Sequence, residues 1–308
     1  MNLHRAGLSQ LLALAACGRV AFDARSDGAH PDGAGTDGAV PCNSPFAAPV
    51  LVPGIGSGTD VHAPTFTPDG LEVIFYSGRS GGLGGSDIWH ATRSDTTQPF
   101  GGETLLPNVN TAADEGGQSL SADGLTMYFS SLRGGGPGSD DVWMTSRADL
   151  ASPFSMPVLV PELSSPDSEY SPTISYDGLE IFIGTNRPGG LGGYDVWHAT
   201  RASLAAPFDP PVDMMEINSS ADDYPGNTSR DRLSLVLWTH RYELVRSDLY
   251  VSTRTDPALP FAPPERANIS IDGVDEIDTK LSADAQTVYF SANTVGNVEA
   301  VTASRSCP

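Results

Sequence analysis

A period of 54 residues runs through most of the chain and restricts its fold more than any other feature. An aspartate that opens a turn recurs at this spacing, and a second aspartate follows it 17 or 18 residues later, two positions before an aromatic residue. Independent markers that share one period indicate copies of one structural unit. The markers are Asp69, Asp123, Asp177, Asp231 and Asp284; Asp87, Asp141, Asp195 and Asp248; Trp89, Trp143, Trp197 and Tyr250; and Pro-Phe pairs at 45–46, 99–100, 153–154, 207–208 and 260–261.

Each unit contains signals for four short strands and none for a helix. In the first unit, residues 65–67 form a short strand, and Pro68-Asp69-Gly70 has the composition of a tight turn. Residues 71–77 are rich in β-forming side chains, a Gly-rich loop follows over 79–86, and further strands are expected at 87–93 and 104–106. Five such units predict an all-β fold, a five-bladed β-propeller of four-stranded blades.

The repeats resemble a known family. The strings TFTPDGLEVIFYSGRSGGLGGSDIWHATR (65–93) and TISYDGLEIFIGTNRPGGLGGYDVWHATR (173–201) are similar to the TolB-type, WD40-like β-propeller repeat. The similarity covers residues 43–308 and is strongest in the first three repeats. The fourth repeat has Asp231-Arg232 in place of Asp-Gly, and the fifth has Asp284-Ala285 and lacks the Asp-x-aromatic signature.

The resemblance also implies how the ring closes. In this family the outermost strand precedes the inner three, so residues 47–52 are expected to complete the blade formed by residues 279–305. The repeat spacing then places Cys42 and Cys307 in the same loop, across the break between the chain ends. We expect a disulfide there in an exported protein, with two free thiols as the alternative.

The first residues have the features of an export signal. A short apolar stretch ends in Leu14-Ala15-Ala16-Cys17, which resembles the lipobox of a bacterial lipoprotein signal peptide, and an ordinary cleaved signal is the alternative. The resemblance implies a signal peptide over 1–17 with lipidation of Cys17. Residues 18–41 are rich in Gly, Ala and Asp and are expected to be a flexible linker, followed by the propeller at 42–308.

The charge of the chain excludes one class of partner. The formal net charge is −21, from 38 acidic and 17 basic residues. A surface this acidic repels the phosphate backbone of a nucleic acid, and nucleic-acid binding is therefore not expected. Cations, basic proteins and neutral glycans remain compatible with it.

Two polar sets recur in every one of the first four repeats, and we interpret them as structural. An arginine ends the second strand and the second recurrent aspartate begins the third, so the two bracket one loop. The expected role is an Asp–Arg clamp or hydrogen bonds to the loop backbone. The arginines are Arg79, Arg133, Arg187 and Arg241, and the aspartates are Asp87, Asp141, Asp195 and Asp248.

The loops that enter the innermost strands carry the candidate site, because these loops surround one mouth of a propeller channel. A ring of carboxylates there could hold a hard cation such as calcium, attract a basic partner, or form a solvated rim with local turn capping. The candidates are Asp60, Asp114, Glu115, Asp167, Glu169, Asp222, Asp223, Asp275 and Glu276.

The function predicted from these features is a lipid-anchored cell-envelope module, in the outer membrane and facing the periplasm or the surface, that binds or scaffolds an envelope protein. The alternative is a carbohydrate-binding or glycoside-hydrolase-type propeller that uses the acidic mouth. No catalytic motif singles out a residue, so an enzyme is the less favoured interpretation. No cofactor is expected apart from calcium as a candidate, and the only membrane contact is through the lipid.

Overall fold

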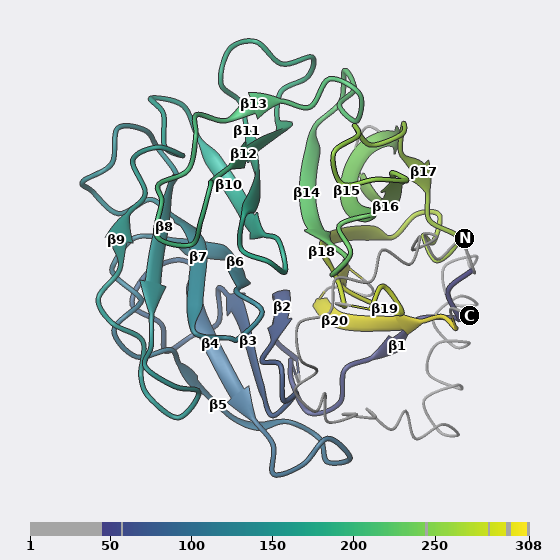
Figure 1. The fold of residues 1–308 in the computed structure, drawn as a ribbon. Coiled ribbons are helices and arrows are strands. Elements are labelled where there is room, and N and C mark those ends of the chain that lie inside the picture. Colours follow the sequence, from purple (N-terminus) through teal and green to yellow (C-terminus); the bar gives the residue numbers. More distant parts are fainter. Residues whose placement is uncertain (1–44, 57, 244–245, 283, 294–296, 307–308) are drawn as a thin grey trace, which may run out of the picture.

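A computed structural model describes residues 45–56, 58–243, 246–282, 284–293 and 297–306. Cys17, Cys42, Cys307 and the expected linker lie outside the described residues. The described residues form an all-β ring of five antiparallel, four-stranded blades around a central axis (Figure 1). They contain no helix that is long and apolar enough to cross a membrane. The predicted fold class is confirmed.

The blades follow one another along the chain, with the innermost strand first. Blade 1 contains β2 (His62–Phe66), β3 (Glu72–Ser77), β4 (Asp87–Thr92) and β5 (Gly101–Leu105). Blade 2 contains β6 (Glu115–Leu120), β7 (Thr126–Ser131), β8 (Asp141–Ser146) and β9 (Val158–Leu159). Blade 3 contains β10 (Glu169–Ile174), β11 (Glu180–Thr185), β12 (Asp195–Thr200) and β13 (Val212–Asp213). Blade 4 contains β14 (Asp223–Thr228), β15 (Ser234–Glu243), β16 (Arg246–Thr253) and β17 (Glu265–Arg266).

Blade 5 is built from both ends of the chain, as expected. It contains β18 (Asp275–Leu281), β19 (Thr287–Asn293), β20 (Val298–Ser304) and β1 (Val50–Leu51). Val50 pairs with Thr302 and Leu51 with Val301, so β1 covers the outer edge of β20 (Figure 1). The divergent fifth repeat therefore forms a complete blade, and the ring closes without leaving that edge exposed.

A stacked arginine explains why Pro-Phe recurs with the period. In each blade the arginine after the third strand lies over the buried phenylalanine, with its Nε donating to the carbonyl at the turn between the first two strands. Arg93 lies 4.2 Å from the Phe100 ring centroid, and Arg305 lies 4.4 Å from the Phe46 ring. The Arg305–Phe46 pair joins the two chain ends, so ring closure has support besides β1. The other pairs are Arg147–Phe154, Arg201–Phe208 and Arg254–Phe261.

The core lies between neighbouring blades rather than within one. Buried side chains of the second and third strands pack face to face across each blade junction; Ile74 and Ile88 of blade 1, for example, pack with Met127 and Phe129 of blade 2. Each innermost strand also contains a register shift, and four of the five have a residue with positive φ there. These bulges turn backbone and side chains toward the channel. The residues are Ala63, Gly117, Ser171 and Asp278.

Candidate functional site

Four of the predicted mouth carboxylates hold neighbouring blades together. Asp114 Oδ1 accepts the N–H groups of Gly85 and Ser86, both at 3.0 Å, and these residues end the Gly-rich loop of the preceding blade. Three further aspartates make the same kind of contact between blades. Asp222 accepts the N–H of Tyr194, Asp275 that of Ser247, and Asp60 that of Val298. These four carboxylates therefore cap loops.

The buried members of the predicted ring form ion pairs with the recurrent arginines. Glu115 lies 3.0 Å from Arg133 Nη2, Glu169 lies 2.9 Å from Arg187 Nη2, and Asp223 contacts Arg241. All three carboxylates also accept backbone N–H groups from the loop before their own strand. Burial nevertheless raises the pKa of Glu169, against the opposing effects of Ser165 and Arg187. The first repeat has Val61 at this position, and there Arg79 contacts Glu103 instead.

The recurrent aspartates at the start of the third strand order the Gly-rich loop through its backbone. Asp87 Oδ2 accepts the N–H groups of Leu83 and Gly84, and Asp195 Oδ2 accepts that of Gly192. Asp141 accepts the N–H of Gly138 in the same way. In blade 4, which lacks this loop, Asp248 pairs with Arg266. Thus three of the four recurrent arginines pair with inner-strand carboxylates, and three of the four recurrent aspartates bind backbone.

Glu276 departs from this pattern, because the fifth repeat has Thr294 where the others have the arginine. Glu276 is fully buried, accepts the N–H of Ile271 at 2.9 Å, and has no described partner for Oε2. Burial, with the nearby Asp248, raises its pKa to about 8. Glu276 is therefore protonated at neutral pH and adds no charge to the mouth.

Asp140 is the mouth carboxylate that the sequence did not single out. It precedes β8 and is half-buried, and the structure shows no hydrogen bond to its side chain from the described residues. Burial, together with Asp114, Asp141 and Glu169, raises its pKa to about 6. Asp167, in the next loop, contributes only backbone groups to the described hydrogen bonds. The side chains of these two residues therefore have no hydrogen-bond partner among the described residues.

The centre of the channel is occupied by a polar network from three blades. Tyr76 Oη lies 2.6 Å from Tyr170 Oη and donates to Asp278 Oδ2 at 3.1 Å. His62 stacks on Tyr76 at a centroid distance of 4.7 Å, and its Nδ1 lies 3.4 Å from Asp278 Oδ2. Burial and the Asp278 carboxylate raise the pKa of both tyrosines well above the usual range. Because blades 1 and 3 are not neighbours, the tyrosine pair bridges the channel.

The chain has a single lysine, Lys280, and it lies in this network. Its side chain is buried, and Nζ donates to Thr173 Oγ1 at 3.0 Å. Burial, opposed by the nearby Asp278 carboxylate, lowers its pKa to about 8. Lys280 belongs to blade 5 and Thr173 to blade 3, so a second bond crosses the channel between blades that are not neighbours.

Two glycines make room for the large side chains at this level. A Cβ at Gly116 would lie 3.1 Å from the Tyr76 ring, and one at Gly184 would lie 3.0 Å from the Tyr224 ring. Tyr224 in turn stacks on Trp238 at 3.9 Å and on Tyr194 at 5.1 Å. The result is an aromatic platform (Tyr194, Tyr224 and Trp238) beside the mouth of the channel, between blades 3 and 4.

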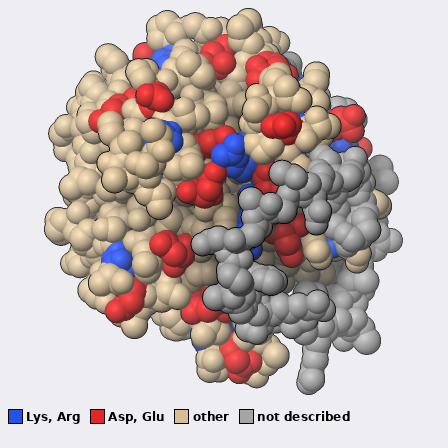
Figure 2. All heavy atoms as spheres, in the orientation of Figure 1, with Lys and Arg blue, Asp and Glu red and all other residues tan. Residues whose placement is uncertain are grey.

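Negative charge is dispersed over the ring. Figure 2 shows acidic side chains spread around one face, with a basic group set among acidic ones near its centre. Within the described residues, no three His, Cys, Asp or Glu side chains come together as a metal ion would require. The predicted mouth residues are thus distributed around the ring, and every carboxylate among them except that of Asp167 is bonded to its own blade or to a neighbouring blade.

The channel residues were missed in the sequence because they depart from the repeat. Lys280 stands where the other repeats have Thr65, Ser119, Thr173 and Asn227, and Asp278 where they have Ala63, Gly117, Ser171 and Pro225. A single lysine that replaces a short polar residue on an innermost strand was the available signal.

Comparison with known proteins identifies the fold alone. No protein-family model matches the sequence, and no curated protein shows significant sequence similarity to it. Among solved structures, the α-L-arabinofuranosidase PaAbf62A from Podospora anserina is 10% identical over 87% of this chain and 98% of that chain, with a TM-score of 0.52. A glycosyl hydrolase from Bacteroides ovatus is 12% identical over 80% and 84%, with a TM-score of 0.50. TolB from Acinetobacter baumannii is 12% identical over 82% of this chain and 56% of its own, with a TM-score of 0.49. The five-bladed propeller is established, and the TolB-type family assignment stays a prediction.

Proposed function

We propose that this chain is a binding protein of the cell envelope, whose acidic channel mouth holds a basic segment of a partner protein. The observation that carries the proposal is the closed channel. Tyr76, Tyr170, Asp278, Lys280 and Thr173 join three blades across its centre, so a ligand meets a floor of hydrogen-bonded side chains. Such a surface suits docking of a chain segment better than enclosure of a substrate.

Asp140 and Asp167 supply the attraction for a basic segment, because the other mouth carboxylates are already bonded to backbone or arginine. Their charge is part of a formal net charge of −21, which accelerates encounter with basic partners at low salt. The predicted lipid on Cys17 would keep the propeller at the membrane, in the outer membrane and facing the periplasm or the surface. Replacing Cys17 with Ala should move the protein from the membrane fraction to the soluble fraction.

The direct test is binding of a fluorescent hexalysine peptide to the full chain, followed by anisotropy, with a hexaglutamine peptide as a neutral control. The double variant Asp140→Asn, Asp167→Asn should weaken hexalysine binding at least fivefold. The double variant Glu216→Gln, Glu265→Gln removes the same formal charge from exposed side chains elsewhere and should change binding less than twofold. If both double variants weakened hexalysine binding equally, the attraction would come from net charge alone, and a site at the mouth would be contradicted.

A second function is favoured by the aromatic platform. Tyrosines stacked between blades 3 and 4, and a carboxylic acid on blade 2 with a pKa of about 6, are elements with which proteins hold sugar rings and protonate a glycosidic oxygen. In that case Tyr194 and Tyr224 bind the sugar and Asp140 acts as the acid. Titration of the chain with a panel of plant and bacterial oligosaccharides separates the two functions: binding lost in Tyr194→Ala favours the carbohydrate function, and no binding by any glycan excludes it.

A further inference from the structure

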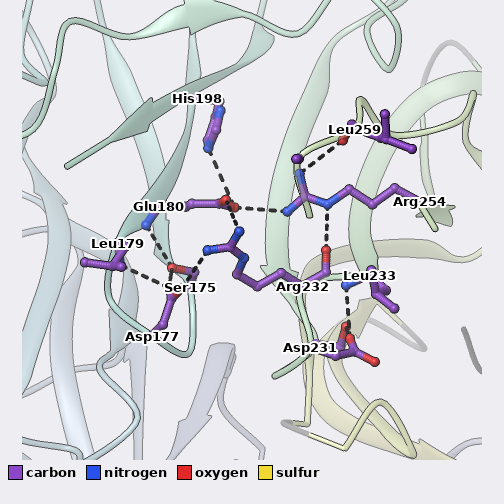
Figure 3. Close-up of polar contacts among 12 residues, drawn as sticks. Ser175, Asp177, Leu179, Glu180, His198, Asp231, Arg232, Leu233, Arg254 and Leu259 are labelled. Atoms are coloured by element: carbon purple, nitrogen blue, oxygen red, sulfur yellow. Dashed lines mark hydrogen bonds and ion pairs between the residues drawn. The ribbon is translucent and has the colours of Figure 1, made fainter. Parts of the chain in front are cut away.

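Two blade junctions share an ion-pair cluster at the end of the ring away from the Gly-rich loops. Between blades 3 and 4, Glu180 lies 3.3 Å from Arg254 Nη2 and 3.4 Å from Arg232 Nη2. Arg232 also contacts Asp177 through Nη1 at 2.7 Å, so its guanidinium bridges two carboxylates (Figure 3). His198 lies beside Glu180, with Nε2 at 3.7 Å.

Arg232 stands at a repeat position that is glycine in the first three repeats. It occupies the last position of the turn between β14 and β15, where the other units have Gly70, Gly124, Gly178 and Ala285. Its φ is 60°, a conformation that is strained for a residue with a side chain. The departure of the fourth repeat from Asp-Gly thus places a guanidinium on the preceding blade.

The junction between blades 1 and 2 has the same surrounding residues, but no guanidinium lies among them. Asp69, Glu72, His90 and Arg147 occupy the positions of Asp177, Glu180, His198 and Arg254, and Gly124 stands where Arg232 does. A cavity of about 370 Å³ lies here, and its lining includes Asp69, Glu72, His90, Arg93 and Leu150. A Cβ at Gly124 would lie 2.9 Å from Leu150 Cδ2 and 3.7 Å from Arg147 Nη2. A side chain at 124 would therefore project against the wall of this cavity.

Some polar atoms at the cavity have no hydrogen-bond partner among the described residues. Asp69 Oδ1 accepts bonds from Thr67 and Leu71, whereas Oδ2, the counterpart of the oxygen that contacts Arg232, has no bond among the described residues. Arg147 is nine-tenths buried, and its Nη1 contacts Glu72 Oε2 at 2.8 Å, as Arg254 contacts Glu180. His90 Nδ1 lies 2.7 Å from Glu72 Oε1, in place of the contact that Arg232 makes with Glu180. His198, by contrast, stacks on Phe182 at 4.8 Å.

We propose that the cavity between blades 1 and 2 binds a guanidinium group, the arginine side chain of a partner protein. Asp69 Oδ2 and Glu72 Oε1 accept its two edges, as Asp177 and Glu180 accept those of Arg232, and the guanidinium replaces His90 Nδ1 at Glu72 Oε1. A planar guanidinium spans two separated carboxylates, whereas an ammonium presents a single point of charge, so arginine is preferred to lysine. The inference does not rest on the channel mouth, which lies at the other end of the strands.

The test is titration of the full chain with N-acetyl-arginine amide, followed by calorimetry or NMR, with N-acetyl-lysine amide as the competitor class. We expect one saturable site for the arginine amide and at least fivefold weaker binding of the lysine amide. Gly124→Arg should fill the cavity from within and abolish binding. Gly124→Ala carries the same backbone strain without the guanidinium and should retain it.

The converse variant gives an independent readout. Arg232→Gly removes the guanidinium from the site between blades 3 and 4, so the number of arginine-amide molecules bound per chain should rise from one to two. If Gly124→Arg does not fold, Asp69→Asn takes its place and should weaken binding of the arginine amide about tenfold. Asp123→Asn is the control and should leave binding unchanged. Asp123 is the same turn residue in the second repeat, which has Thr126 where the first has Glu72.

No saturable site in the unaltered chain, or binding that survives both Gly124→Arg and Asp69→Asn, would overturn the proposal. Hexalysine binding at the mouth is expected to be unaffected by Gly124→Arg, so the two proposals fail separately.

Discussion

Lys280 Nζ donates a hydrogen bond to Thr173 Oγ1 at 3.0 Å, although the two residues come from blades 5 and 3, which are not neighbours in the ring. Together with the Tyr76–Tyr170 pair, this contact makes the channel centre part of the structure that holds the blades in place. Propeller blades otherwise contact only the blades on either side, so bonds across the channel add a constraint on the ring that the repeat itself does not provide.

The Tyr76 hydroxyl group should stabilise the fold because it donates a hydrogen bond to the buried Asp278. Tyr76→Phe removes the donor to Asp278 Oδ2 and the contact with Tyr170, and it should lower the free energy of unfolding by about 2 kcal/mol. Tyr194→Phe is the control, because the described structure gives the Tyr194 hydroxyl no hydrogen bond; its effect should stay within about 0.5 kcal/mol. Urea unfolding curves measure both, and equal effects would contradict the assignment.

Glu169 and Glu276 occupy the same repeat position, but their replacement should change stability by different amounts. Glu169→Gln leaves Arg187 without its carboxylate partner and should cost about 3 kcal/mol at pH 7. Glu276, whose pKa is raised to about 8, is already neutral there, so Glu276→Gln should change stability by less than about 1 kcal/mol. Thermal unfolding at pH 7 compares them; a large loss in Glu276→Gln would show that the carboxylate is ionised and paired.

The raised pKa of Asp140 predicts a dependence of stability on pH. A carboxyl whose pKa is about 6 when folded and 3.8 otherwise destabilises the fold when ionised, fully above pH 6, and the penalty disappears as the pH falls toward 4. Asp140→Asn should therefore stabilise the protein by about 1 kcal/mol at pH 7.5, after allowance for partial exposure, and have no effect near pH 4. Glu216→Gln, at an exposed carboxylate, should change neither value. A gain of equal size at both pH values would show that the effect does not come from the charge.

The predicted disulfide between Cys42 and Cys307 lies outside the described residues, but the ends on either side of it are brought together by β1–β20 and by Arg305 and Phe46. Its loop would span 307 − 42 = 265 residues. Cys42→Ser combined with Cys307→Ser should lower stability by up to about 5 kcal/mol on the chain-entropy account. Non-reducing peptide mapping of the exported protein checks the bond itself, and two free thiols there would exclude it.

The sequence was sufficient for the architecture because repeated markers record repeated structure. The two series of recurrent aspartates, the aromatic residues and the Pro-Phe pairs predicted five blades, and the resemblance to the TolB-type repeat implied that residues 47–52 complete the fifth blade. The same reasoning could not find Lys280, Asp278 or Tyr76, since they occur once each and meet only when the ring has closed. It also treated the mouth carboxylates as a single set. In the structure they separate into four loop caps, three buried ion pairs, the unbonded Asp167 and the buried Glu276 without an arginine, according to which backbone or arginine lies opposite each one.

The binding-protein account depends most on a channel that is closed at Lys280, and the single lysine makes this measurable. The intact chain is treated at pH 8 with an amine-acetylating reagent, and the peptide containing Lys280 is quantified by mass spectrometry. With a pKa of about 8, about half of the amine is in the reactive neutral form, so protection must come from burial. The account predicts no modification of Lys280 in the folded chain and complete modification after unfolding. Acetylation of folded Lys280 at the rate of a free lysine would mean an open channel and would contradict the account.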